Sequence, residues 1–160
     1  FKTFTFTRGI LILSNKWDKR YMQMAEVVST WSKDPSTKIG AVAIGSKGQV
    51  LAQGYNGFPR GIDDSDDRLN NREEKYKYVV HAEMNLIYNA TYNGISLCDS
   101  VVYVHGLPAC SECAKGLIQV GVKGIVMNKE SIENANEHWH ESFELTIQLL
   151  NEAGVHWKTV

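Results

Sequence analysis

The chain has 160 residues, of which 43% are hydrophobic and 22% are charged, a composition typical of a soluble globular protein with one core. Its formal net charge is only −1, so it lacks the positive field of proteins that bind a long nucleic acid, and we expect no polynucleotide partner. The longest apolar runs, such as 101–104, are too short to cross a bilayer, so we expect no membrane partner.

Residues 1–14 mix aromatic, threonine and apolar residues without the small-residue cleavage site of a secretory signal. We interpret them as an N-terminal extension or a truncation remnant, with a short strand as an equal alternative. Residues 15–160 are then expected to form a single domain. Two of the three cysteines are spaced C-x-x-C, which fits metal or redox chemistry in a reducing compartment better than a disulfide framework. We therefore expect a cytoplasmic protein.

The first half of this domain begins with an amphipathic pattern. Apolar residues at three- and four-residue spacing predict a helix over 17–31. Two β-prone runs at 39–44 and 49–52 flank a Gly-Ser-Lys-Gly turn and predict a hairpin. The next segment, 54–61, is rich in turn formers and is expected to be a loop. Residues 62–77 fit either a flexible connection or a short polar helix, and we expect them to lie over a site.

The second half alternates between helical and strand patterns. Helices are predicted at 79–89, 110–120 and 137–153, and short buried strands at 101–104 and 124–128. Two strand–helix–strand passages after a hairpin predict a mixed central sheet with helices on both faces. The expected fold class is thus α/β, a three-layer α/β/α domain whose site lies beyond the strand ends, where helix N-termini converge.

Two short motifs at predicted helix starts carry the candidate chemistry. His81, Cys110 and Cys113 together provide the three ligands of a catalytic zinc and leave a fourth position for water. Bound zinc lowers the pKa of water enough to make it a nucleophile near neutral pH. Glu83 lies two residues from a ligand, so its carboxylate can point into the same cavity and transfer protons. One zinc ion per chain and a catalytic Glu83 are therefore predicted.

Each motif also has an alternative reading. The C-x-x-C pair could be half of a structural zinc site or a thioredoxin-like redox pair. Glu83 could be a solvated helix residue. The combination of both motifs favours the catalytic metal centre.

The sequence around these residues resembles the deoxycytidylate deaminases of the cytidine deaminase superfamily. The resemblance rests on S-K-D-P-S-T-K-I-G-A at 32–41, G-Y-N-G-F-P-R-G at 54–61, H-A-E-M-N at 81–85 and the C-x-x-C motif, and it runs from 17 to 155. One departure is Ala109, which separates Pro108 from the first cysteine of the motif. Some relatives hold an extra zinc through cysteines where this chain has Asp34 and Pro35, which again implies a single zinc.

The resemblance implies that dCMP and water give dUMP and ammonia, which supplies thymidylate synthesis. It also implies a homo-oligomer, often a hexamer, that dCTP activates and dTTP inhibits with Mg²⁺. The candidate substrate-binding residues are Asn56 at the sugar hydroxyl, Ala82, and the phosphate-end candidates Ser32, Lys33, Lys38 and Arg60. An effector or interface role is implied for one loop, comprising Gly54, Tyr55, Gly57, Phe58 and Arg60.

Two alternatives stay open from the sequence alone. The same metal centre could deaminate another cytosine or adenine species, such as a nucleoside, a riboflavin precursor or a tRNA base. The low net charge argues against tRNA. A non-catalytic zinc module for assembly would require a fourth protein ligand, and no other Cys or His has convincing spacing.

Overall fold

The structure is a computed structural model, and it describes residues 15–160. The expected extension at 1–14 lies outside the described residues. Within 15–160, no helix is both long and apolar enough to span a membrane. The elements run in the order α1 (Asn15–Ser29), β1 (Gly40–Ile44), β2 (Val50–Tyr55), α2 (Asp66–Asn70), α3 (Arg72–Tyr78), α4 (Ala82–Tyr92), β3 (Val101–His105), α5 (Ser111–Gln119), β4 (Gly124–Met127), α6 (Lys129–Glu133), η1 (Glu137–Trp139), α7 (His140–Ala153) and β5 (His156–Thr159).

The five strands form one mixed sheet in the order β2-β1-β3-β4-β5. The hairpin strands β1 and β2 are antiparallel, and β1 also runs antiparallel to β3. The strands β3, β4 and β5 are parallel, and each parallel connection passes through a helix. This confirms the predicted mixed sheet.

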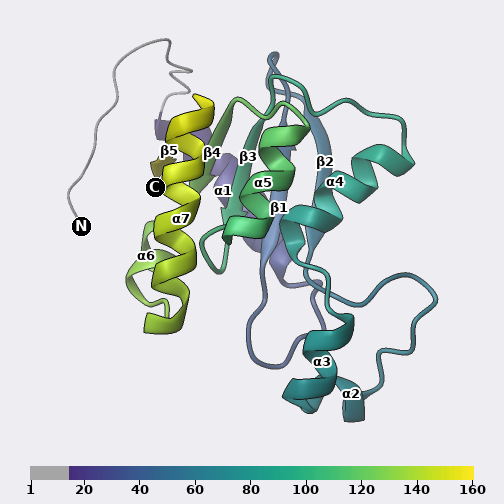
Figure 1. Ribbon diagram of the computed structural model, residues 1–160. Coiled ribbons are helices and arrows are strands. Elements are labelled where there is room, and N and C mark those ends of the chain that lie inside the picture. Colours follow the sequence, from purple (N-terminus) through teal and green to yellow (C-terminus); the bar gives the residue numbers. More distant parts are fainter. Residues whose placement is uncertain (1–14) are drawn as a thin grey trace.

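Helices cover both faces of the sheet, as predicted (Figure 1). On one face α4, α5 and α7 pack over a cluster that includes Ala41, Val102 and Ile125. On the other face α1 packs over a second cluster that includes Val42 and Tyr103. Alternate residues of β1 thus point to opposite faces, as the period of a strand requires. The domain is a three-layer α/β/α fold.

Several boundaries differ from the prediction. Gly54 and Tyr55 belong to β2 and not to a loop. A Cβ on Gly54 would collide with main-chain atoms of Ala82 and Leu86, so glycine is needed where β2 approaches α4. The polar segment 62–77 forms the short helices α2 and most of α3. The sequence patterns also missed α6 and β5, and the expected helix at 137–153 begins as the 3₁₀ helix η1.

The fold brings the starts of α4 and α5 together at one end of the sheet. Both helices lie on the same face of the sheet, and β3 runs between them in sequence. The α4 helix stops after Tyr92, and the chain returns through β3 to the turn that precedes α5. The segment of α6 and η1 lies at this same end of the sheet (Figure 1).

Candidate active site and metal centre

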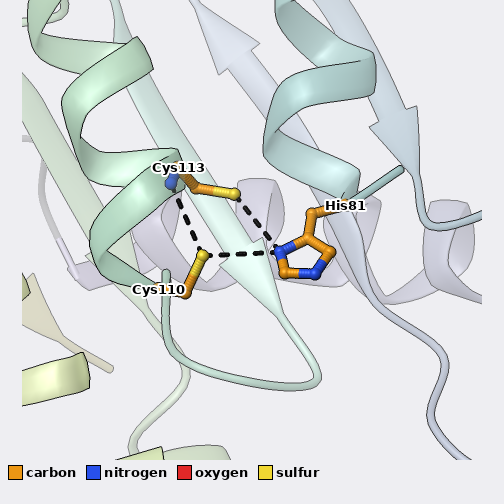
Figure 2. Close-up of side chains that lie close together, drawn as sticks. All are labelled: His81, Cys110 and Cys113. Carbon is orange, nitrogen blue, oxygen red and sulfur yellow. Dashed lines mark hydrogen bonds between the residues drawn. The ribbon is translucent and has the colours of Figure 1, made fainter. Parts of the chain in front are cut away.

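The three predicted metal ligands come together at two helix N-termini. His81 is the N-cap of α4, Cys110 is the N-cap of α5, and Cys113 lies in the first turn of α5. The backbone N–H of Cys113 donates a hydrogen bond to Cys110 Sγ over 3.4 Å. Figure 2 shows the His81 ring facing both sulfur atoms across the gap between the helices. The two motifs, far apart in sequence, thus form one cluster.

The geometry of this cluster fits a zinc ion. His81 Nδ1 lies 3.4 Å from Cys110 Sγ and 3.5 Å from Cys113 Sγ, and all three ligand atoms lie within 4.8 Å of one another. A tetrahedral zinc with Zn–S of about 2.3 Å and Zn–N of about 2.0–2.1 Å places nitrogen and sulfur roughly 3.5 Å apart. His81, Cys110 and Cys113 would therefore hold the ion with little movement, and three protein ligands are the number found in catalytic zinc sites.

Of the three candidate ligands, Cys110 is the one whose surroundings favour the metal-binding form before a metal is present. Hydrogen bonds from Cys113 and His81 lower the pKa of Cys110 to about 4, which favours its thiolate. Hydrogen bonding to Cys110 and burial raise the pKa of Cys113, so in the metal-free site this thiol is the proton donor. The pKa of His81 is raised, chiefly by its hydrogen bond with Cys110. Because a metal requires both thiolates, its binding releases protons from the cluster.

Glu83 lies beside this cluster and is almost fully buried, with 3% of its surface exposed. Burial raises its pKa to about 7, since the charged carboxylate loses its hydration. Its carboxyl group also interacts with the Cys113 side chain. Glu83 lines the same cavity as His81 and Cys110. A buried carboxyl group in such a place can accept or donate a proton near neutral pH.

The cavity in front of the cluster has a volume of about 340 Å³, which suits a small molecule. One part of its wall is α3, which contributes Arg72, Lys75 and Tyr76. Another part is η1, which contributes His138 and Trp139. Aromatic rings and hydrogen-bonding groups thus surround a site whose deep end holds Glu83 and the metal ligands.

Asn56, predicted at the substrate sugar, does line this cavity and is buried. The Ile39 N–H donates to Asn56 Oδ1, and Asn56 Nδ2 donates to the Thr37 carbonyl, each over 2.9 Å. Asn56 therefore fixes the wall segment formed by Thr37 and Ile39, and one N–H of its amide stays available. Its contact with the sugar remains a prediction.

In the described part of the chain, the other predicted substrate residues do not line this cavity. Ala82 is fully buried at the first position of α4, where a backbone N–H has no partner within the helix. Ser32 is buried, and its hydroxyl donates to the Asn56 carbonyl over 2.8 Å, so it secures a loop. Lys33 pairs with Asp64 at 2.8 Å on the surface, and Lys38 is exposed. In the described chain, Ser32, Lys33 and Lys38 are not among the residues that line the cavity.

The predicted effector or interface loop packs onto neighbouring elements in three ways. Gly57 forms a β-bridge with Val80, next to the predicted metal ligand His81. Phe58 packs against Tyr78 with ring centroids 5.5 Å apart. Arg60 donates to Asn89 Oδ1 over 2.5 Å and lies over the Tyr92 ring at 5.3 Å. Tyr55 remains exposed at the end of β2, whereas Gly54 is packed beneath α4.

Sequence reasoning missed the cavity residues of α3 and η1. Lys75 is buried and pairs with buried Asp34 at 3.1 Å, and Arg72 lies one turn earlier in α3. Trp139 follows Asn136 and His138 in the wall near η1. The only available signal was a polar segment directly before His81, and it did not show which cations face the site.

Residues 15–129 match the family model described as the cytidine and deoxycytidylate deaminase zinc-binding region. The chain belongs to this family. Family members with curated descriptions include an uncharacterized deaminase in the luxG 3′ region of Aliivibrio fischeri, 39% identical over 141 residues, covering 88% of this chain and 91% of that protein. The human deoxycytidylate deaminase is 36% identical over 149 residues, covering 88% of this chain and 77% of that protein.

A solved family structure agrees with the fold. The dCMP deaminase from the cyanophage S-TIM5, in complex with dCMP and dUMP, has a TM-score of 0.72 and 25% identity to this chain. The match covers 92% of this chain and 99% of that one. The predicted membership of the cytidine deaminase superfamily is thereby confirmed.

Proposed function

We propose that this chain catalyses the hydrolytic deamination of dCMP to dUMP and ammonia. The family match, the human deoxycytidylate deaminase and the cyanophage enzyme in complex with dCMP and dUMP support this substrate. The observation that carries the reaction type is the buried Glu83 carboxyl group, which shares a cavity with the zinc-compatible cluster.

The residues of the site have two roles, metal binding and proton transfer. His81, Cys110 and Cys113 hold zinc, which when bound supplies the Lewis acidity that makes water nucleophilic near neutral pH. Glu83 takes a proton from the attacking water and passes it to N3 of the cytosine ring. As this first proton moves, the water oxygen bonds to C4, and Glu83 then takes the proton that is left on that oxygen and delivers it to the amino group on C4, so that a C4 carbonyl forms. The C4–N bond breaks, and ammonia leaves.

Burial of Glu83 suits both of its roles. Burial keeps its pKa near 7, so neither the acid nor the carboxylate form is strongly favoured at neutral pH. Glu83 is the second residue of α4, and it lines the cavity together with His81 and Cys110. Glu83 can therefore exchange protons first with the attacking water and then with the cytosine ring.

The proposal is tested by measuring ammonia release from dCMP, CMP, deoxycytidine and dCTP with zinc-loaded protein. We expect the highest kcat/KM with dCMP. A higher kcat/KM with any of the other three would reject dCMP as the substrate. Ammonia release from none of them would reject this deaminase activity altogether.

We also propose that the enzyme is a homo-oligomer, a hexamer by resemblance. Exposed aromatic side chains support an interface at the outer face of α4 and the end of β2, namely Trp31, Tyr55, Tyr88 and Tyr92. Arg60 contacts this face through Tyr92, which favours an interface role for its loop. Sedimentation of a monomer at working concentration would contradict this proposal.

Regulation and location are proposed on the resemblance and on the cysteines. We propose that dCTP activates the enzyme and that dTTP inhibits it, with Mg²⁺ bound to the triphosphate. A cytoplasmic location is supported by the three free thiols, two of which are metal ligands that must stay reduced. Kinetics indifferent to both triphosphates in the presence of Mg²⁺ would contradict the regulatory proposal.

A further inference from the structure

The cavity wall contains one lysine and one arginine, Lys75 and Arg72, and the two differ in their surroundings. Lys75 is buried, and its Nζ donates to Asp34 Oδ1 over 3.1 Å and to the Ser36 hydroxyl over 3.4 Å. Its charge is therefore balanced within the protein. A ligand that drew Lys75 away would leave the buried Asp34 carboxylate without its cation, which is costly.

Arg72 is the other cation, and it is exposed on α3. Its Nε donates to the Tyr76 hydroxyl over 3.1 Å, and its guanidinium lies 5.3 Å from the Tyr76 ring centroid. These contacts hold the side chain on one face of the helix. Among residues 15–160 no carboxylate pairs with Arg72, so its terminal N–H groups are free of an acidic partner.

The charges along the cavity have a clear order. Glu83 and the metal ligands lie at the buried end, and Arg72 lies at an exposed part of the wall. The six residue steps of α3 between Arg72 and Tyr78 span about 9 Å along the helix axis, and His81 follows three residues later. A base at the metal end and a phosphate at Arg72 would lie at different parts of this one cavity, with the sugar between them.

We propose that Arg72 binds the 5′-phosphate of the substrate and thereby makes the enzyme select a nucleotide over a nucleoside. This inference rests on the proposed function, because it assumes that cytosine occupies the metal end of the cavity. A planar guanidinium whose terminal N–H groups have no acidic partner among residues 15–160 suits a phosphate group. Lys33 and Lys38 do not line the cavity, so neither provides the charge that Arg72 offers.

The test compares two substrates in two variants of the full-length, zinc-loaded protein. We expect Arg72→Gln to lower the ratio of kcat/KM for dCMP to kcat/KM for deoxycytidine by about 10- to 100-fold, since one charge-assisted contact is lost. Most of this change is expected in KM for dCMP. Arg72→Lys should recover part of the ratio, because it restores the charge without the planar fork.

Arg68→Gln is the matched control. Arg68 precedes Arg72 by four residues and contacts a tyrosine in the same way, lying 4.7 Å from the Tyr78 ring centroid, but it does not line the cavity. We expect this control to leave the substrate ratio unchanged. An Arg72→Gln enzyme with the wild-type ratio, or with equal losses on both substrates, would overturn the inference. A wild-type enzyme that does not deaminate dCMP would instead reject the proposed function.

Discussion

Replacing Glu83 by Gln separates proton transfer from metal binding. The side chain is 97% buried, and Gln has nearly the same size and shape, so the packing around it is expected to stay intact. Gln cannot accept and release a proton in this pH range. A positioned acid–base group contributes about 10²- to 10⁴-fold to rate, which corresponds to roughly 2.7–5.4 kcal/mol of transition-state stabilisation. We therefore expect kcat for dCMP to fall by at least about 10²-fold.

Three measurements on the Glu83→Gln protein make this prediction decisive. Zinc content by elemental analysis should match wild type, because the cluster is formed by His81, Cys110 and Cys113 alone. Binding of dCMP by calorimetry should remain measurable. A turnover within about threefold of wild type would refute the proton-transfer role, given the magnitude expected for such a group. Loss of zinc would show instead that Glu83 is a ligand.

Three further predictions concern the metal and the packing around the site. Cys113→Ala should lose zinc and activity together, whereas Cys98→Ala, at an exposed cysteine, should keep both; full zinc in the first variant would contradict the ligand set. Asp34→Ala leaves the buried Lys75 ammonium unpaired and should cost about 3–5 kcal/mol in urea unfolding, so a loss below about 1 kcal/mol would show that water replaces the carboxylate. Gly54→Ala should lower the unfolding free energy by about 1–3 kcal/mol, because the methyl group collides with the α4 backbone, and an unchanged value would mean that β2 and α4 can separate freely.

The cluster of candidate metal ligands could be predicted from sequence because its determinants are local. Each motif has its ligands at a helix start, and the buried strand at 101–104 and the following turn bring the two starts together. The sequence also predicted α1, but its apolar spacing placed Met24 and Trp31 on the packed face, whereas the structure leaves both exposed and buries Met22. The exact buried face depends on how the helix is rotated against the sheet, which periodicity alone does not determine.

The parts that could not be predicted depend on neighbours far away in sequence. The strand β5 reads His-Trp-Lys-Thr and has no strong apolar pattern, because it lies at the edge of the sheet and pairs only with β4. Lys33 and Lys38 were predicted at the phosphate because they belong to the family-like motif at 32–41. The lysine and arginine that line the cavity are instead Lys75 and Arg72. Which of several lysines and arginines faces a cavity is decided by how α3 docks, and the sequence carries no periodic signal for it.

The position of the candidate metal ligands would also make folding depend on metal supply. His81 lies at the start of α4 and Cys113 in α5, so one bound ion would tie together two segments of the same helical layer that are 32 residues apart. An ion that binds only the native arrangement shifts the folding equilibrium by mass action. Once zinc exceeds its dissociation constant, each tenfold rise in free zinc adds about 1.4 kcal/mol to the apparent stability. The concentration of available zinc in the cell would then help to determine which fraction of the newly made chains is folded.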